Sequence, residues 1–98
     1  MATIDILRQH ALDRDEAKRR AEALANDMQA ELGIRWVWDG DRIKFDAASG
    51  AAKGVSGLVH VDGASVRVEA DLPFLLRAIK GTIEAKIVEK LDKVIRGK

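Results

Sequence analysis

Residues 72–95, LPFLLRAIKGTIEAKIVEKLDKVI, place large apolar side chains at steps of three and four. This spacing puts them on one face of an α-helix. Pro73 suits the first helical position, where its missing N–H leaves no bond unmade, and Gly81 predicts a bend or a short break. The stretch therefore predicts a long C-terminal helix whose apolar stripe the rest of the chain must cover: Leu72, Leu76, Ile79, Ile83, Ile87, Leu91, Val94 and Ile95.

The composition of the chain predicts one globular domain over residues 1–98, with 47% hydrophobic and 34% charged residues. A formal net charge of +1 gives no overall attraction to nucleic acid or to an anionic membrane. No cysteine is present, which excludes disulfides, thiolate catalysis and zinc–cysteine sites. The N-terminus lacks the regions of a signal peptide, and no apolar run approaches the ~20 residues that span a bilayer, so we expect a cytoplasmic protein.

The first third of the chain predicts a strand followed by a helix. Residues 3–10 carry Ile4, Ile6 and Leu7 and are typical of a strand. Asp13 followed by Glu16 is a capping-box arrangement, which predicts a helix that begins there and runs to about Leu32. Gly33 stands where a helix-terminating glycine is expected, and the predicted buried stripe of this helix is Ala17, Ala21, Leu24, Met28 and Leu32.

Two β-hairpins follow, each built around an Asp-Gly pair. Residues 34–38 and 41–46 flank Asp39-Gly40, and residues 55–61 and 64–71 flank Asp62-Gly63. If each Asp-Gly pair forms a two-residue loop, both registers put the apolar residues on one side of the sheet. The predicted pairs are Trp36 with Ile43, Ile34 with Phe45, Val59 with Val66, Gly57 with Val68 and Val55 with Ala70. The small residues 47–54 between the hairpins predict a loop.

The predicted order of strand, helix, four strands and helix indicates a two-layer α+β domain with an antiparallel five-stranded sheet. We expect the long C-terminal helix to pack on the apolar face of that sheet. This order resembles a reduced helix-grip fold, which carries no function by itself. The residues predicted on the apolar face are Ile4, Ile6, Trp36, Ile43, Phe45, Val59, Val66 and Val68.

No pattern of residues predicts a catalytic, metal-binding or cofactor-binding site. His10 and His60 lack ligands at metal-binding spacing, and surface or strand-end positions are the better interpretation. Ser56 follows Gly54-Val55, but Leu58 stands where a nucleophile elbow needs its second glycine. The glycines at 50, 54 and 57 match no phosphate-binding motif. We therefore expect a protein that is not an enzyme.

Two surfaces are candidates for binding. Trp38, Phe74 and Leu75 are the candidate apolar contact surface, although Trp38 could equally belong to the core. The outer sheet face carries a local excess of basic residues, without the aromatic residues that single-strand binders interleave, so nucleic acid is not an expected partner. This face is either a solvated surface or the interface of a homodimer, and its basic residues are Arg35, Arg42, Lys44 and Arg67.

Three stretches together resemble the polyhydroxyalkanoic acid system family of small bacterial proteins, also called the polyhydroxyalkanoate granule region family. They are LGIRWVWDGDRIKF at residues 32–45, KGVSG at residues 53–57, and LPFLLR at residues 72–77 with KGTIEA at residues 80–85. The resemblance covers almost the whole chain. It implies a link to polyhydroxyalkanoate storage, and it supplies no catalytic residues.

The resemblance implies a non-enzymatic accessory or interaction protein whose partner is the granule surface or a granule protein. Polyester synthases of this system use a cysteine nucleophile, and depolymerases use a serine elbow; this chain has neither. The alternative is a small module that binds an apolar or acyl ligand between the sheet and the C-terminal helix.

Overall fold

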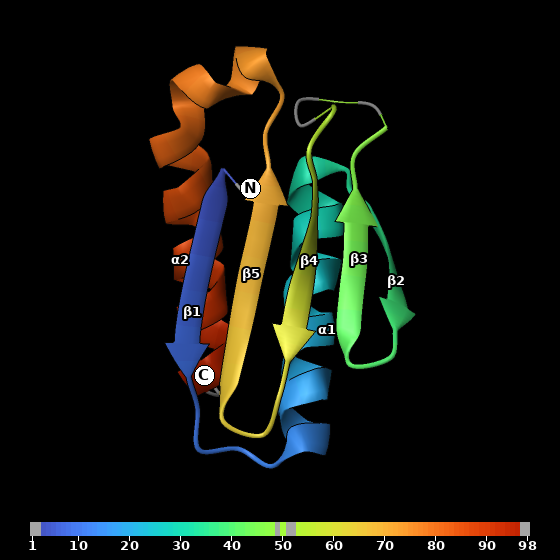
Figure 1. Cartoon of the computed structure of the whole chain (residues 1–98), viewed down its shortest axis with the longest axis vertical. Coiled ribbons are helices and arrows are strands. Elements are labelled where there is room, and N and C mark those ends of the chain that lie inside the picture. Colours follow the sequence, from blue (N-terminus) through green and yellow to red (C-terminus); the bar gives the residue numbers. More distant parts are fainter. Residues whose placement is uncertain (1–2, 49, 51–52, 97–98) are drawn as a thin grey trace.

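A computed structural model describes residues 3–48, 50 and 53–96 of the chain, and Figure 1 shows its sheet in front of two helices. Of the predicted loop, Ser49, Ala51 and Ala52 lie outside the described residues. The predicted order of elements is confirmed, with one short 3₁₀ helix (η1) added. The elements are β1 (Ile4–Gln9), α1 (Arg14–Leu32), β2 (Arg35–Asp39), β3 (Arg42–Asp46), β4 (Ser56–Val61), β5 (Ser65–Asp71), η1 (Phe74–Ile79) and α2 (Lys80–Arg96).

The sheet is antiparallel throughout and has the strand order β1-β5-β4-β3-β2 (Figure 1). Strands β2 to β5 form a meander in which each strand pairs with the next in sequence. Strand β1 joins the far edge beside β5, with Ile4 opposite Ala70 and Gln9 opposite Ser65. The two edges of the sheet are therefore its first two strands in sequence.

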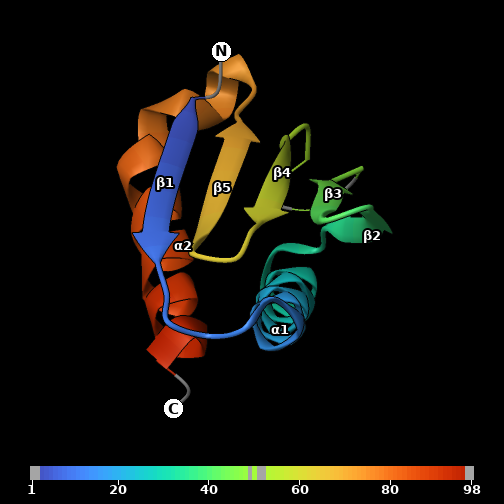
Figure 2. The same cartoon turned by 60° about the horizontal axis from the view of Figure 1, so that its bottom comes forward.

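Both helices pack on the same face of the sheet, antiparallel to each other (Figures 1 and 2). Helix α2 lies over β1, and α1 lies beside it over β2 and β4. The C-terminal helix thus covers part of the apolar face, and α1 covers the rest. Of the predicted face residues, Trp36 is half-buried against the core and the other seven are buried: Ile4, Ile6, Ile43, Phe45, Val59, Val66 and Val68.

Helix α1 begins and ends as its sequence predicts. The Asp13 carboxylate accepts a hydrogen bond from the Glu16 backbone N–H at 2.8 Å, which satisfies one of the free amides of the first turn. The Gly33 N–H donates to the Gln29 carbonyl and ends the helix. Ala17, Ala21, Leu24 and Met28 of the predicted stripe are buried, and Leu32 is half-buried.

The predicted register of the first hairpin is wrong, because the two-residue loop lies one residue further along the chain than predicted. Trp36 pairs with Phe45 and Trp38 with Ile43, because Asp39 is the last strand residue and pairs with Arg42. The loop is therefore Gly40-Asp41. Gly40 has a φ of +64°, as the first central position of a type II′ turn requires.

The second hairpin shows the same shift. Val59 pairs with Val68, Val61 with Val66 and Gly57 with Ala70. Strand β4 ends at Val61, and the Asp62 N–H donates to the Ser65 carbonyl at 3.0 Å, which leaves Gly63-Ala64 at the tip of the loop. The carboxylate of Asp62 accepts from the backbone N–H groups of Ala64 and Ser65. Each shift moves the pairing by an even number of residues, and the buried face is therefore the one predicted.

The predicted C-terminal helix is not continuous, because its first residues form the separate 3₁₀ helix η1. After Pro73 the chain makes a 3₁₀ helix, with the Leu76 N–H bonded to the Pro73 carbonyl, and α2 begins at Lys80. The break thus precedes Gly81, which lies in the first turn of α2. A 3₁₀ helix has three residues per turn and not 3.6, so Ile79 leaves the predicted stripe and is 49% exposed, whereas Ile87 and Leu91 are buried as predicted.

Candidate functional site

The most exposed large apolar side chains of the described residues lie on η1. Phe74 is 81% exposed and Leu75 is 85% exposed, with Ile79 at the other end of the same element. We call these three residues the η1 surface. Phe74 and Leu75 are two of the three residues predicted as an apolar contact surface, and the structure leaves both without a packing partner.

The chain beneath the η1 surface is fixed to the sheet. Leu72 is buried, its N–H donates to Thr3 Oγ1 at 3.3 Å, and its carbonyl accepts from Arg77 Nε at 3.3 Å. Pro73 packs against Gly54, where a Cβ atom would lie 3.0 Å from Pro73 Cγ. Phe74 and Leu75 are thus exposed on a base that is held by Thr3, just before β1, and by Gly54, in the connection before β4.

Trp38, the third predicted contact residue, lies apart from the η1 surface. It is the next-to-last residue of β2, a strand that points downward in Figure 1, whereas η1 lies at the top of the same view. Its indole Nε1 donates to Glu22 at 2.9 Å, and Lys18 Nζ lies 5.0 Å from the ring centroid. Trp38 therefore joins β2 to α1, and we do not include it in the apolar surface.

The predicted basic face is balanced by carboxylates. Each of its four cations is paired with an acidic side chain on the same face, namely Arg35 with Asp46, Arg42 and Lys44 with Asp39, and Arg67 with Asp5. The hydrogen bond from Arg67 lowers the pKa of Asp5. Glu69 and Asp71 also point outward in the register, so this face carries no basic excess. Such a face does not favour nucleic acid.

Apolar residues on the outer face are separated by charges. Val37 is 62% exposed and Leu58 is half-buried, and Lys44 stands between them in the cross-strand row. On the other side of Leu58 the row continues through Glu69 to Asp5. The face therefore offers no continuous apolar patch to a second copy of the chain.

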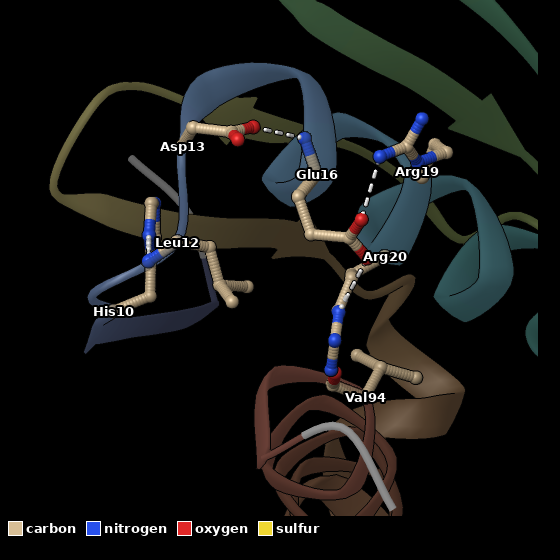
Figure 3. Close-up of polar contacts among 7 residues, drawn as sticks. All are labelled: His10, Leu12, Asp13, Glu16, Arg19, Arg20 and Val94. Atoms are coloured by element: carbon tan, nitrogen blue, oxygen red, sulfur yellow. Dashed lines mark hydrogen bonds and ion pairs between the residues drawn. The ribbon is translucent and has the colours of Figure 1, made fainter.

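Both histidines have local hydrogen-bond partners. His10 Nδ1 accepts from the Leu12 N–H at 3.1 Å, and its Nε2 lies 3.0 Å from the Asp62 carbonyl, so His10 shapes the β1–α1 connection (Figure 3). His60 Nε2 lies 2.6 Å from a Glu69 carboxylate oxygen. Within residues 3–48, 50 and 53–96, no group of three or more metal-ligating side chains is present. The same residues include no helix long and apolar enough to cross a bilayer.

An apolar cleft of about 150 Å³ lies between the two helices and the sheet, in the region where the sequence suggested, as the alternative, a site for an apolar or acyl ligand. Met28 and Leu32 of α1 form one wall, and Ile83 and Ile87 of α2 form the other. The ring of Phe45 contributes to its base. Each of these residues was predicted as core, and the structure shows that the core is open here.

The comparisons with known proteins give one match. The model of a protein family described as "Putative polyhydroxyalkanoic acid system protein" matches residues 4–95. No curated protein and no solved structure matches significantly, so the resemblance to a helix-grip fold stays a prediction. The family match spans every described strand, all of α1, and α2 up to its next-to-last residue.

Proposed function

The chain belongs to the polyhydroxyalkanoic acid system family, and we propose that it is a non-enzymatic accessory protein that binds the surface of polyhydroxyalkanoate granules in the cytoplasm. The observation that carries this proposal is the η1 surface. A polyester granule presents an apolar surface to water, and an apolar group gains free energy when it moves from water onto such a surface.

The η1 surface has the properties that adsorption needs. Phe74 and Leu75 are adjacent, point into solvent and are fixed from below through Leu72 and Pro73. Burying one such side chain contributes about 1.5–3 kcal/mol. Because the base is already ordered by the fold, little conformational entropy is lost when the surface binds.

A non-enzymatic role is supported by the chemistry of the side chains. The chain has no cysteine to serve as a nucleophile. Ser56 is the first residue of β4, paired with Asp46 and Asp71, and does not lie on the strand-to-helix turn of a nucleophile elbow. The cations of the outer face are engaged by carboxylates.

The test is binding to purified granules with the double substitution Phe74→Glu and Leu75→Glu. Val37→Glu is the matched control, since Val37 is also an exposed apolar residue but lies on β2. Circular dichroism first establishes that both variants are folded. We expect the double variant to lose at least about tenfold in partitioning to granules in a sedimentation assay, from the lost burial energy, and Val37→Glu to bind as the unmodified protein does.

Two results would overturn the proposal. One is that the unmodified protein does not sediment with granules at all. The other is that Val37→Glu weakens sedimentation as much as the double variant does, which would mean that η1 is not the contact. A fluorescent fusion that localises to granules in cells, and loses that localisation with the double substitution, supports it independently.

A further inference from the structure

Helices α1 and α2 run side by side but leave an apolar cleft between them near the end of α1. Glu31, the residue before the last of α1, forms an ion pair with Lys90 Nζ at 2.8 Å. Met28 and Leu32 of α1 line one side of the cleft, and Ile83 and Ile87 of α2 line the other.

The cleft is apolar inside and polar only at its rim. Its base is formed by Phe45, Ile34 and Val55 from the sheet side. Thr82 and Lys86 line it while remaining exposed, so they lie at its mouth. They are four residues apart on α2 and therefore on the same face of the helix.

The size of the cleft limits what can enter it. An apolar cavity of about 150 Å³ accommodates a benzene molecule, which has six carbons. A linear acyl chain of about six carbons therefore fills the space. Longer chains would extend past the rim into solvent and would gain nothing from their added methylenes.

The charge at the rim of the cleft favours a ligand with an anionic group. Within the part of the chain that the structure describes, Lys86 makes no ion pair and no side-chain hydrogen bond. The neighbouring Glu31 carboxylate is already bound by Lys90. An ammonium group and a hydroxyl at the mouth of an apolar cleft complement an anion that carries an apolar tail.

We propose that the cleft binds a linear medium-chain carboxylate, with an acyl chain of about six carbons between α1 and α2 and its carboxylate at Lys86 and Thr82. This site shares Ile79 with the η1 surface but uses neither Phe74 nor Leu75. It goes beyond granule binding, and either function can fail without the other.

The first test is a titration of the folded, isotope-labelled protein with butanoate, hexanoate, octanoate and decanoate below their micelle concentrations, followed by ¹H–¹⁵N NMR. Each buried methylene should raise the affinity about fourfold up to about six carbons, after which the affinity should level off. The largest amide shifts are expected at Leu32, Ile83 and Ile87. The double variant of Phe74 and Leu75 should bind hexanoate as the unmodified protein does.

Three variants separate the acyl and the carboxylate contributions. Ile83→Trp fills the cleft and should abolish binding. Lys86→Met should weaken hexanoate binding about two- to fivefold, the range expected for an exposed ion pair, and should leave hexan-1-ol binding unchanged. Lys93→Met is the matched control, because Lys93 is an exposed lysine of α2 outside the cleft, and it should not weaken either ligand.

Several results would overturn the proposal. These are the absence of saturable shifts, an affinity that does not depend on chain length, or equal effects of Lys86→Met and Lys93→Met. Shifts of cleft amides that appear on raising the protein concentration alone would mean that a second copy occupies the cleft, and this too would overturn it.

Discussion

The ring of Phe45 lies on the backbone of Gly57 across the β3–β4 pair, and no side chain fits between them. A Cβ atom at position 57 would lie 2.7 Å from Phe45 Cζ and would overlap the Glu69 carbonyl oxygen. Gly57→Ala therefore forces the sheet apart at its centre. We expect it to lower the free energy of unfolding by about 3 kcal/mol, measured by urea denaturation.

Gly63→Ala is the control for that substitution. Gly63 lies in the β4–β5 loop with no atom within 4 Å of an added Cβ and without a positive φ. We expect a change of less than about 0.5 kcal/mol. If Gly57→Ala were as well tolerated as Gly63→Ala, the pairing of Gly57 with Phe45 in the β3–β4 register would be wrong.

Gly81→Ala should stabilise the protein. Gly81 lies in the first turn of α2, has no positive φ, and has open space around the added methyl group. Alanine reduces the freedom of the unfolded chain and favours the helix, so we expect a gain of about 0.5–1 kcal/mol. Thermal unfolding measures it, and a loss of stability would show that glycine is needed at this position for a reason outside helix propensity.

Gly54→Ala tests the base of the η1 surface. Gly54 has a φ of +94°, and its added Cβ would lie 3.0 Å from Pro73. Gly40→Ala separates the two costs, because Gly40 also has positive φ but has open space around it. We expect about 1–2 kcal/mol of destabilisation for Gly40→Ala from backbone strain alone, and a larger loss for Gly54→Ala. Equal losses would mean that the Pro73 contact contributes nothing.

Arg20 joins the start of α1 to the end of α2 (Figure 3). Its Nε donates to Glu16 at 2.9 Å and its Nη1 donates to the Val94 carbonyl at 2.7 Å, one of the last carbonyls of α2 that no helical N–H can reach. We expect Arg20→Met to cost about 1.5 kcal/mol in unfolding experiments.

Arg19→Met is the matched control for Arg20. Arg19 also pairs with Glu16, but its side chain is 70% exposed and does not reach α2. An exposed pair of this kind contributes about 0.2–1 kcal/mol. Similar losses for the two variants would contradict a role of the Val94 contact in holding the helices together.

The Glu31–Lys90 pair makes stability depend on pH. The hydrogen bond from Lys90 lowers the pKa of Glu31, so this contribution is present above about pH 4.5 and is lost as pH falls through the lowered pKa of the folded protein. The same bond raises the pKa of Lys90, so its contribution is present below about pH 10.5 and is lost as pH rises through the raised value.

Glu31→Gln tests this pH dependence. We expect the variant to be less stable than the unmodified protein at pH 7 and to approach it in stability at acid pH, where Glu31 is protonated in both the folded and the unfolded chain. Adding Lys90→Met to it should cause little further loss at pH 7, because the partner is already absent. A difference that persists unchanged at low pH would show that the carboxylate charge is not the cause.

The fold was predictable because several local signals agreed. The Asp13 cap, the Gly33 end and the alternating hairpins each point to one element, and the structure has all of them. The hairpin loops were misplaced because an Asp-Gly pair is compatible with two loops. Gly40 can be either the second residue of an Asp39-Gly40 loop or the first residue of a Gly40-Asp41 loop. The structure has the Gly40-Asp41 loop, because Asp39 pairs with Arg42.

The exposed apolar surface was predictable only for residues that lie outside the apolar stripe of the predicted helix. Phe74 and Leu75 fell outside the helical stripe, and they are exposed. Trp38 was ambiguous because the hydrogen bond that fixes it comes from Glu22, on another element. A ligand site between the sheet and the C-terminal helix was the alternative suggested by the sequence, and the cleft lies in that region. Its lining could not be predicted, because Met28 and Leu32 of α1 follow the same apolar pattern as packed core residues.

The placement of β1 at the edge of the sheet beside β5 has a consequence for how the chain folds. Strands β2 to β5 can pair through short local loops, whereas Ile4 must find Ala70. Strand β1 therefore completes the sheet late, after a long loop has been closed at an entropic cost. Until then β5 has an open edge that partly folded chains expose to one another, and in the folded protein β1 covers that edge.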